Sequence, residues 1–174
     1  MPCTVRVVGS SGSGKTTFVE GVLPVLRRRG LRVGTVKHAS HGFIADRPGS
    51  DSARHAAAGA SPVLLTGPAG HVLFDLDAPV DPPGLDDLVA RYFGDRDLVL
   101  VEGHSLEAGP CVVVSRRGVP RRDDLPIHDA LFVVGDESFG HPVAIAAGDV
   151  NAAADLLEAH VRQAAPRPPG RRHP

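Results

Sequence analysis

Short apolar runs alternate along the chain with longer segments in which apolar residues recur every three or four positions. The short runs predict β-strands, and they cover residues 4–8, 31–37, 97–103, 111–114, 131–134 and 143–146. The periodic segments predict helices, and they cover residues 15–29, 51–58, the stretch from 85 to 92 and the stretch from 150 to 161. Because strands and helices alternate, we expect a three-layer α/β fold with a mostly parallel sheet flanked by helices.

One stretch breaks this alternation. Residues 62–66 and 71–75 are two strand-like runs that flank Gly67-Pro68-Ala69-Gly70. This pattern predicts a β-hairpin with a four-residue turn, inserted near residues 62–75. Such a hairpin could extend a sheet or meet a second subunit, and an ordinary edge hairpin is the alternative.

The first predicted strand leads into the stretch Gly9–Thr17, which fits the pattern G-x-x-x-x-G-K-[ST] and precedes a predicted helix. Glycines let consecutive backbone N–H groups turn around phosphates, while Lys15 reaches the β and γ groups and the Thr16 hydroxyl joins a Mg²⁺ shell. Only two of the 19 basic residues are lysines, and one stands here, where a compact charge suits phosphate oxygens. The sequence therefore predicts a P-loop NTPase fold.

A second landmark is the apolar strand at residues 97–103, which ends in Glu102 and a glycine. A continuous apolar run is typical of a strand buried on both faces of a parallel sheet, and its carboxyl end lies at the edge where ligands bind. In a Walker B strand the acid at this place holds Mg²⁺, directly or through water, or orients an attacking water. We therefore predict Thr16 and Glu102 as metal ligands, and Lys15 and Glu102 as the catalytic residues.

The second predicted strand ends in Lys37 and His38 and continues into a loop that carries Asp46. Ligand loops of open parallel sheets lie at that end. His38, His41 and His55 surround this loop, and imidazoles are good ligands for nickel or zinc, so a P-loop metallochaperone NTPase is an alternative function. No cysteine accompanies them in the sequence, which favours ordinary hydrogen bonding to phosphate or carboxylate.

A turn-rich loop between two later strands carries four arginines, namely Arg116, Arg117, Arg121 and Arg122. They could fold over a triphosphate as a lid, although solvated loop charge is the more common role of such a run. A lid would suit a small-molecule kinase with Glu102 or Asp46 as its base, and this is a further alternative.

Length and composition limit the other possibilities. At 174 residues the chain has the size of one domain, which we place at residues 1–164, with a disordered Pro- and Arg-rich tail at 165–174. A formal net charge of −1 argues against nucleic acid or an anionic membrane as a partner. No run approaches the ~20 apolar residues of a membrane span, and Cys3 and Cys111 form no C-x-x-C pair, so we expect a cytoplasmic protein with reduced thiols.

Several blocks of the sequence, taken together, are more specific than the P-loop alone. Besides the P-loop and the strand at 97–103, they are Val36-Lys37-His38-Ala39-Ser40-His41-Gly42-Phe43, Asp46, Pro48-Gly49, Asp51-Ser52, Arg54-His55 and Ala58-Gly59-Ala60. In order and spacing these blocks resemble the molybdopterin-guanine dinucleotide biosynthesis protein B (MobB) family. The resemblance is strong over residues 3–103 and faint afterwards.

The resemblance implies a homodimeric, cytoplasmic GTP-binding protein that works beside the molybdenum cofactor guanylyltransferase, with molybdopterin as a further ligand. It also implies slow Mg²⁺-dependent hydrolysis of GTP. A further alternative function is a nucleotide-binding adaptor for which hydrolysis does not matter. The residues that it assigns to nucleotide or cofactor binding are Gly12, Ser13, Gly14, Lys15, Thr16, Thr17, Lys37, His38 and Asp46.

The sequence departs from the family's pattern after Gly103. The family continues with Phe-Lys, whereas His104 and Ser105 stand here, so Arg116, Arg117 or an incoming subunit would have to replace that basic group. The Asn-Lys-x-Asp signature that reads guanine in many GTPases is also absent from the sequence, and only the resemblance favours GTP over ATP. We place a base-contacting loop at residues 143–149.

Overall fold

A computed structural model describes residues 1–39, 42–75, 83–103 and 108–164. The chain divides into two compact units, one formed by Met1–His38 with Leu88–Pro174 and the other by Ala39–Asp87. The single domain at 1–164 stays a prediction, and the predicted disordered tail at 165–174 lies outside the described residues.

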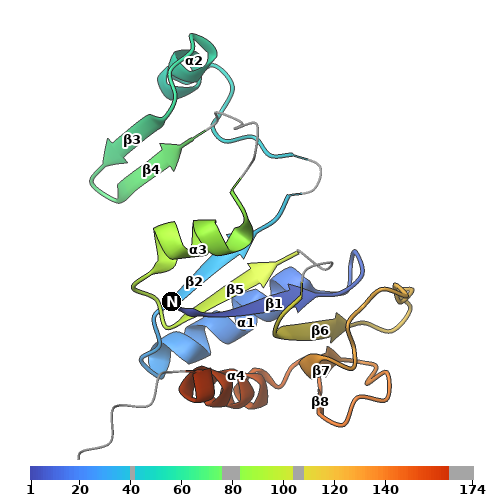
Figure 1. The fold of residues 1–174 in the computed structure, drawn as a ribbon. Coiled ribbons are helices and arrows are strands. Elements are labelled where there is room, and N and C mark those ends of the chain that lie inside the picture. The colour runs from blue at the N-terminus through green and yellow to red at the C-terminus, as the bar shows by residue number, and fades with distance from the viewer. Residues whose placement is uncertain (40–41, 76–82, 104–107, 165–174) are drawn as a thin grey trace, which may run out of the picture. The chain divides into compact units, whose positions relative to one another are not determined.

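The first unit contains a parallel sheet. Within the described residues it has six strands in the order β2-β5-β1-β6-β7-β8, and each pairing is parallel (Figure 1). The strands are β1 (Cys3–Val8), β2 (Val33–Lys37), β5 (Leu98–Glu102), β6 (Cys111–Ser115), β7 (Ala130–Gly135) and β8 (Ala144–Ile145). Every residue of β5 and β6 is buried, as continuous apolar runs in a parallel sheet require. The sequence placed all six strands, although β2 begins later and β8 is shorter than predicted.

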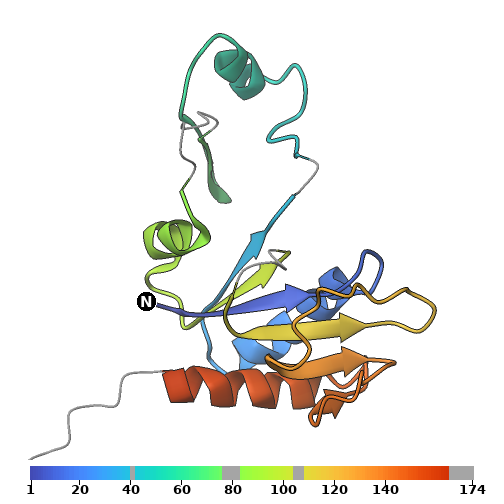
Figure 2. The same cartoon turned by 45° about the vertical axis from the view of Figure 1, so that its right-hand side comes forward.

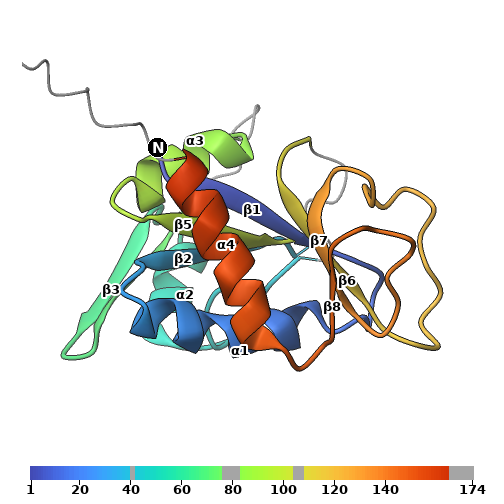
Figure 3. The same ribbon diagram turned by 90° about the horizontal axis from the view of Figure 1, so that it is seen from below.

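Helices cover both faces of this sheet. α1 (Lys15–Arg28) and α4 (Val150–Ala164) lie side by side on one face, and α3 (Leu85–Phe93) lies on the other (Figures 1 and 3). The core under α1 and α4 consists of Val5, Val7, Phe18, Val22, Val25, Leu26, Leu98, Leu100, Val112, Val114, Phe132, Val134, Ala153, Ala154 and Leu157. The predicted three-layer P-loop fold is therefore confirmed.

The opposite face is covered in two places. Next to β2, a Cβ atom on Gly34 would lie 2.4 Å from Cδ1 of Phe93, so glycine lets the end of α3 approach the sheet closely. Next to β6 and β7, the loop between these two strands packs onto the sheet, where its Leu125 and Ile127 join Val113 in a cluster. The long connection between β6 and β7 is thus partly a core segment.

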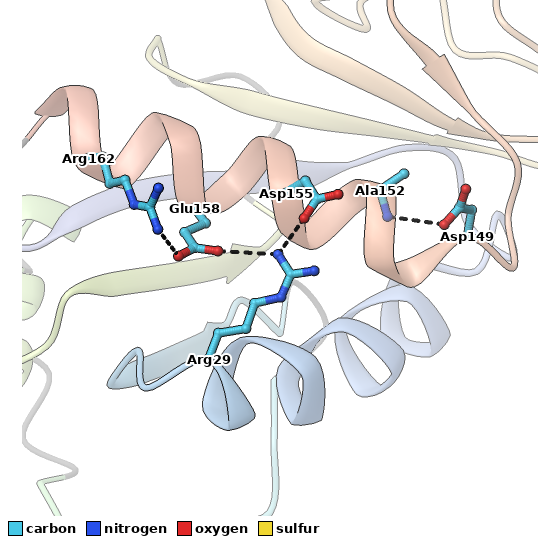
Figure 4. Close-up of polar contacts among 6 residues, drawn as sticks. All are labelled: Arg29, Asp149, Ala152, Asp155, Glu158 and Arg162. Atoms are coloured by element: carbon cyan, nitrogen blue, oxygen red, sulfur yellow. Dashed lines mark hydrogen bonds and ion pairs between the residues drawn. The ribbon is translucent and has the colours of Figure 1, made fainter.

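Polar contacts join the two helices on the first face (Figure 4). Arg29, just after α1, donates from Nη1 to Asp155 Oδ1 at 2.6 Å and to Glu158 Oε2 at 3.2 Å. The other oxygen of Glu158 accepts from Arg162 at 2.6 Å. These hydrogen bonds, chiefly the one to Asp155, raise the pKa of Arg29. The guanidinium at the end of α1 therefore fixes that end against two turns of α4.

The second unit contains a helix and a hairpin, α2 (Asp51–Ala57), β3 (Val63–Gly67) and β4 (Gly70–Phe74). The predicted hairpin is confirmed, but its connection has two residues and not four, because Gly67 and Gly70 pair with each other. Across both units, no helix in the described part of the chain is long and apolar enough to cross a membrane.

Candidate nucleotide-binding site

The loop between β1 and α1 depends on its glycines for its backbone conformation. Gly14 has a φ of 97°, in the left-handed region that favours glycine. A Cβ atom on Gly9 would lie 2.5 Å from the carbonyl oxygen of Val114, so only glycine fits where the loop passes β6. Within the described residues no side chain caps the first turn of α1, and that turn carries no acidic residue. Its N–H groups are therefore available to an anion.

Lys15 lies across this loop. Its Nζ donates to the carbonyl oxygens of Gly9 at 2.9 Å and Ser10 at 2.8 Å. Burial lowers the pKa of Lys15; the neighbouring Glu102 opposes this effect, whereas the cations Lys37 and Arg122 add to it. The ammonium is thus held over the loop, where an incoming anion would raise its pKa again.

Glu102 is at the centre of a polar cluster at the carboxyl end of β5. The parallel register aligns Glu102 with Val7 of β1 on one side and with Lys37 of β2 on the other. Although Glu102 is only 8% exposed, its Oε1 accepts from Thr16 Oγ1 at 2.9 Å and from Lys37 Nζ. The structure therefore brings together three residues that the sequence selected separately.

The carboxyl ends of several strands meet at this edge, as Figure 2 shows for β1, β6 and β7, whose arrows point the same way. His38 continues β2, and its backbone N–H donates to the carbonyl oxygen of Glu102 at 2.9 Å. A Cβ atom on Gly103 would lie 2.9 Å from the Cβ of His38. His38 is therefore fixed by its backbone beside Glu102.

Asp46 belongs to the second unit, where it organises the start of α2. Its carboxylate accepts from the hydroxyls of Ser50, at 2.6 Å, and Ser52, and from the backbone N–H of Arg47 at 2.7 Å. These hydrogen bonds, first that from Ser50, lower the pKa of Asp46. Ser50 in turn caps α2 by accepting from the N–H of Ala53. The contacts of Asp46 in this unit are thus local, and its predicted role in cofactor binding stays a prediction.

The metallochaperone alternative requires His38, His41 and His55 to lie together around a metal ion. His41 lies outside the described residues, and His55 is on α2. Among the residues that are described, no group of three His, Cys, Asp or Glu side chains could hold a metal ion.

The four-arginine loop lies against the P-loop. The hydroxyl of Ser10 donates to the carbonyl oxygen of Pro120 at 2.6 Å. Arg122 pairs with Asp124, with 2.9 Å between Nε and Oδ1, and Arg121 lies over the ring of Phe139 at 5.6 Å from its centroid. Two of the four arginines thus have partners next to their own loop, and the loop is close enough to the P-loop to border a bound nucleotide.

A cavity of about 350 Å³ opens beside the P-loop. It is lined by Ser13, Gly14, Thr17, Phe18, Val114, Ser115, Arg116, Val134, Asp136 and Ala147. Ser13 is 4% exposed, and its hydroxyl has no hydrogen-bond partner among the described residues. Of this lining, the sequence had singled out the P-loop residues, Arg116 and, through the segment 143–149, Ala147. Asp136 was missed, because a lone acid after a strand carries no motif.

The departure from the family's pattern at His104 and Ser105 lies outside the described residues.

Comparison with known proteins identifies the family. Residues 4–135 match the family model described as Molybdopterin guanine dinucleotide synthesis protein B. A Haemophilus influenzae protein named molybdopterin-guanine dinucleotide biosynthesis adapter protein is 39% identical over 114 residues, which are 64% of this chain and 62% of that protein. The Escherichia coli protein of the same name is 30% identical over 156 residues, 84% of this chain and 86% of the relative.

The fold agrees with this match. A crystal structure of molybdopterin-guanine biosynthesis protein B superposes with a TM-score of 0.72 and 28% sequence identity, covering 91% of this chain and 99% of that one. The family match, which spans residues 4–135, includes the P-loop and the strand that ends in Glu102. The chain therefore belongs to the MobB family.

Proposed function

We propose that this protein binds GTP with Mg²⁺, hydrolyses it slowly, and acts as an adapter for the guanylyltransferase that completes molybdopterin guanine dinucleotide. The observation that carries the proposal is the uncapped start of α1 beneath a P-loop in a chain of this family. The names of the curated relatives, biosynthesis adapter proteins, support the pathway and the adapter role.

The residues present fit a triphosphate. The free N–H groups at the start of α1 and the positive φ of Gly14 suit an anion. Lys15 already bridges two carbonyl oxygens of the loop, so its ammonium needs only a small rotation to exchange one of them for a phosphate oxygen. The buried, unpartnered hydroxyl of Ser13 offers a further donor within the described site.

The contact between Thr16 and Glu102 fits Mg²⁺. Neighbouring ligands of an octahedral Mg²⁺, each at about 2.0–2.1 Å, lie about 2.9 Å apart. The oxygens Thr16 Oγ1 and Glu102 Oε1 are separated by 2.9 Å. Thr16 and Glu102 would hold the ion, and the ion would supply positive charge that neutralises the phosphates.

The charge balance supports slow hydrolysis. Lys15 would stabilise charge that develops on the phosphate oxygens. Glu102, however, already accepts from Thr16 and from the ammonium of Lys37 through Oε1, so that oxygen is engaged and less available to orient an attacking water. Slow hydrolysis would leave bound GTP intact while a partner responds to it.

The hairpin supports a homodimer. Leu64 pairs with Leu73 and Leu65 pairs with Val72, so both faces of the hairpin are apolar. These side chains are 42–58% exposed. A two-stranded hairpin is marginal in water unless another element covers an apolar face, and a second copy of the chain would supply one. Cys3 and Cys111 are free thiols, which supports a location in the cytoplasm.

A nucleotide titration tests the proposal. GTP and ATP are titrated by calorimetry, with and without Mg²⁺, into wild type, Lys15→Ala and Arg28→Ala. Arg28→Ala is the matched control, because it removes one exposed cation from the far end of the same helix. We expect a large loss of affinity in Lys15→Ala alone. Equal binding by all three proteins would refute nucleotide binding at the P-loop.

The adapter role needs its own experiment. Cofactor synthesis by purified guanylyltransferase is measured with wild type and with a variant that binds GTP and does not hydrolyse it. Full synthesis with that variant would make this protein a nucleotide-binding adaptor, whereas its failure would make hydrolysis part of the function.

The dimer is tested by measuring the molar mass of wild type and Leu64→Asp by light scattering. If the variant keeps the molar mass of a dimer, the hairpin is not part of the dimer interface.

A further inference from the structure

The cavity beside the P-loop is the strongest unassigned feature of the sheet unit. Its lining includes Ser13, Gly14 and Thr17 from the phosphate-binding segment, so a nucleotide whose phosphates lie on that segment would extend into it. Its volume of about 350 Å³ falls in the range of small-molecule pockets, about 300–1,000 Å³. The cavity is therefore in the right place, and large enough, for the base of a nucleotide.

The walls of the cavity combine apolar and polar surfaces. Phe18, Val114 and Val134 form apolar lining, and all three are largely buried in the core beneath, so they would offer a rigid surface to a flat ring. The polar lining includes Arg116 and Asp136. Asp136 is the single acidic residue among the described residues that line the cavity.

We propose that this cavity receives the guanine base of GTP and that Asp136 is the residue that distinguishes guanine from adenine. The proposal rests on the proposed function, since it assumes that the triphosphate is held by the P-loop. An ionised carboxylate only accepts hydrogen bonds. The Watson–Crick edge of guanine presents two neighbouring donors, N1–H and the N2 amino group, which a carboxylate accepts together, whereas adenine presents an acceptor at N1.

Neighbouring residues hold Asp136 in place. Its Oδ2 accepts from the backbone N–H of Arg117 at 3.0 Å. A Cβ atom on Gly135 would lie 2.0 Å from the carbonyl oxygen of Ser115, so glycine lets the ends of β6 and β7 converge. Ser115 Oγ donates to the carbonyl oxygen of Glu137 at 2.7 Å and accepts from its N–H at 3.0 Å. The segment that carries Asp136 is thus fastened on both sides.

Ala147 completes the cavity from the segment after β8. This small side chain leaves room beside Asp136, and the segment lies next to β7 through the parallel pairing of β7 with β8. The base site would therefore be built from four separate parts of the chain, namely the P-loop, the end of β6, the end of β7 and the segment after β8.

The test measures which base is preferred. GTP, ATP, ITP and XTP are titrated by calorimetry in Mg²⁺ into wild type, Asp136→Ala, Asp136→Asn and the control Glu137→Gln, and circular dichroism checks that each variant is folded. Glu137→Gln is matched because it neutralises the adjacent exposed acid, which does not line the cavity. Xanthine has an oxygen where guanine has its N2 amino group, so a carboxylate repels it and an amide donates to it.

We expect wild type to prefer GTP, with ITP weaker because it lacks the amino group. Asp136→Ala should lose about 10- to 100-fold in GTP affinity, as expected for a charged hydrogen bond, and keep its ATP affinity. Asp136→Asn should gain affinity for XTP by at least about tenfold, while Glu137→Gln behaves as wild type. The gain for XTP is informative because a merely damaged protein would not show it.

Other outcomes separate this inference from the function on which it rests. If Lys15→Ala abolishes binding and Asp136→Ala keeps the wild-type ratio of GTP to ATP affinity, the P-loop function stands and the base assignment is wrong. A folded Asp136→Asn protein without a gain for XTP also overturns the assignment. If Lys15→Ala binds every nucleotide as wild type does, both proposals fail.

Discussion

Replacing Glu102 by glutamine should separate the contribution of Mg²⁺ to GTP binding from that of the phosphate-binding loop. The substitution keeps the size of the side chain and an oxygen that can accept from Thr16, but it removes the negative charge. That charge now faces Thr16 and Lys37 through Oε1. A loss confined to solutions that contain Mg²⁺ is therefore expected.

The magnitude follows from the burial of the carboxylate. The side chain of Glu102 is 11% exposed, so the small range for surface ion pairs, about 0–1 kcal/mol, does not apply. A charged contact with little solvent contributes about 1.5–3 kcal/mol, which is about 10- to 100-fold in affinity. Without Mg²⁺ the substitution should instead raise the affinity for GTP, because it removes a negative charge near the phosphates. Two charges about 4 Å apart interact by about 1 kcal/mol even in bulk water, and more strongly where solvent is excluded, which predicts a gain of at least about fivefold.

Both the loss in Mg²⁺ and the gain without it are measured by calorimetric titration of GTP into wild type, Glu102→Gln and Asp97→Asn, with Mg²⁺ or with EDTA. Asp97 is a suitable control because it precedes the same strand at its opposite end, where it pairs with Arg32. A similar loss in Mg²⁺ and in EDTA would indicate general damage to the loop. Unchanged affinity in Mg²⁺ would remove Glu102 from the metal site.

Three further predictions concern stability and charge. Leu157→Ala, on the fully buried face of α4, should lower the free energy of unfolding in urea by about 2–5 kcal/mol; a smaller loss would mean that the core collapses around the gap. Hydrogen bonds from Arg32 lower the pKa of Asp97. The stability that this pair adds to the fold is therefore present above the pKa of Asp97 in the unfolded chain, and it is lost as the pH falls through the pKa of Asp97 in the folded protein. Asp97→Asn should therefore be less stable at pH 7, by less than about 1 kcal/mol, and equal to wild type in strong acid; a pH-independent deficit in melting would contradict this. Lys37→Met should lower the Mg²⁺ concentration needed for half-maximal GTP binding, because it removes the cation on Glu102, and an unchanged or higher value would contradict that competition.

The parts of the fold that the sequence predicted well are those in which one local pattern decides the outcome. The run before Glu102 is apolar at every position, and burial of all five residues of β5 follows from it. The hairpin was located correctly, but its turn was not, because Gly67 and Gly70 add one more pair in the same register, and a glycine at that place suits either the end of a strand or the turn. β8 has two residues, fewer than the apolar run at 143–146.

The residues of the candidate site also differ in how well the sequence alone could predict them. Lys15, Thr16 and Glu102 could be chosen from the sequence because a phosphate loop and a buried acidic strand end are chemical patterns in themselves. The contact of Glu102 with Lys37 follows once β2 and β5 are adjacent and parallel. Asp46 had the right residue type for a ligand, yet in its own unit its carboxylate is engaged by Ser50 and Ser52.

The proposed base site explains why phosphate recognition can be read from this sequence and base recognition cannot. Triphosphate binding uses backbone N–H groups of consecutive residues, so its requirement for glycine and lysine is written in one short segment. A base needs a flat apolar wall and one or two acceptors, and here these come from segments as far apart as Ser13 and Ala147. Each is an ordinary residue for its local structure, and the pairing of β6, β7 and β8 is what places them together. Asp136 lines the same cavity as the P-loop residues and would acquire its proposed role only through that pairing.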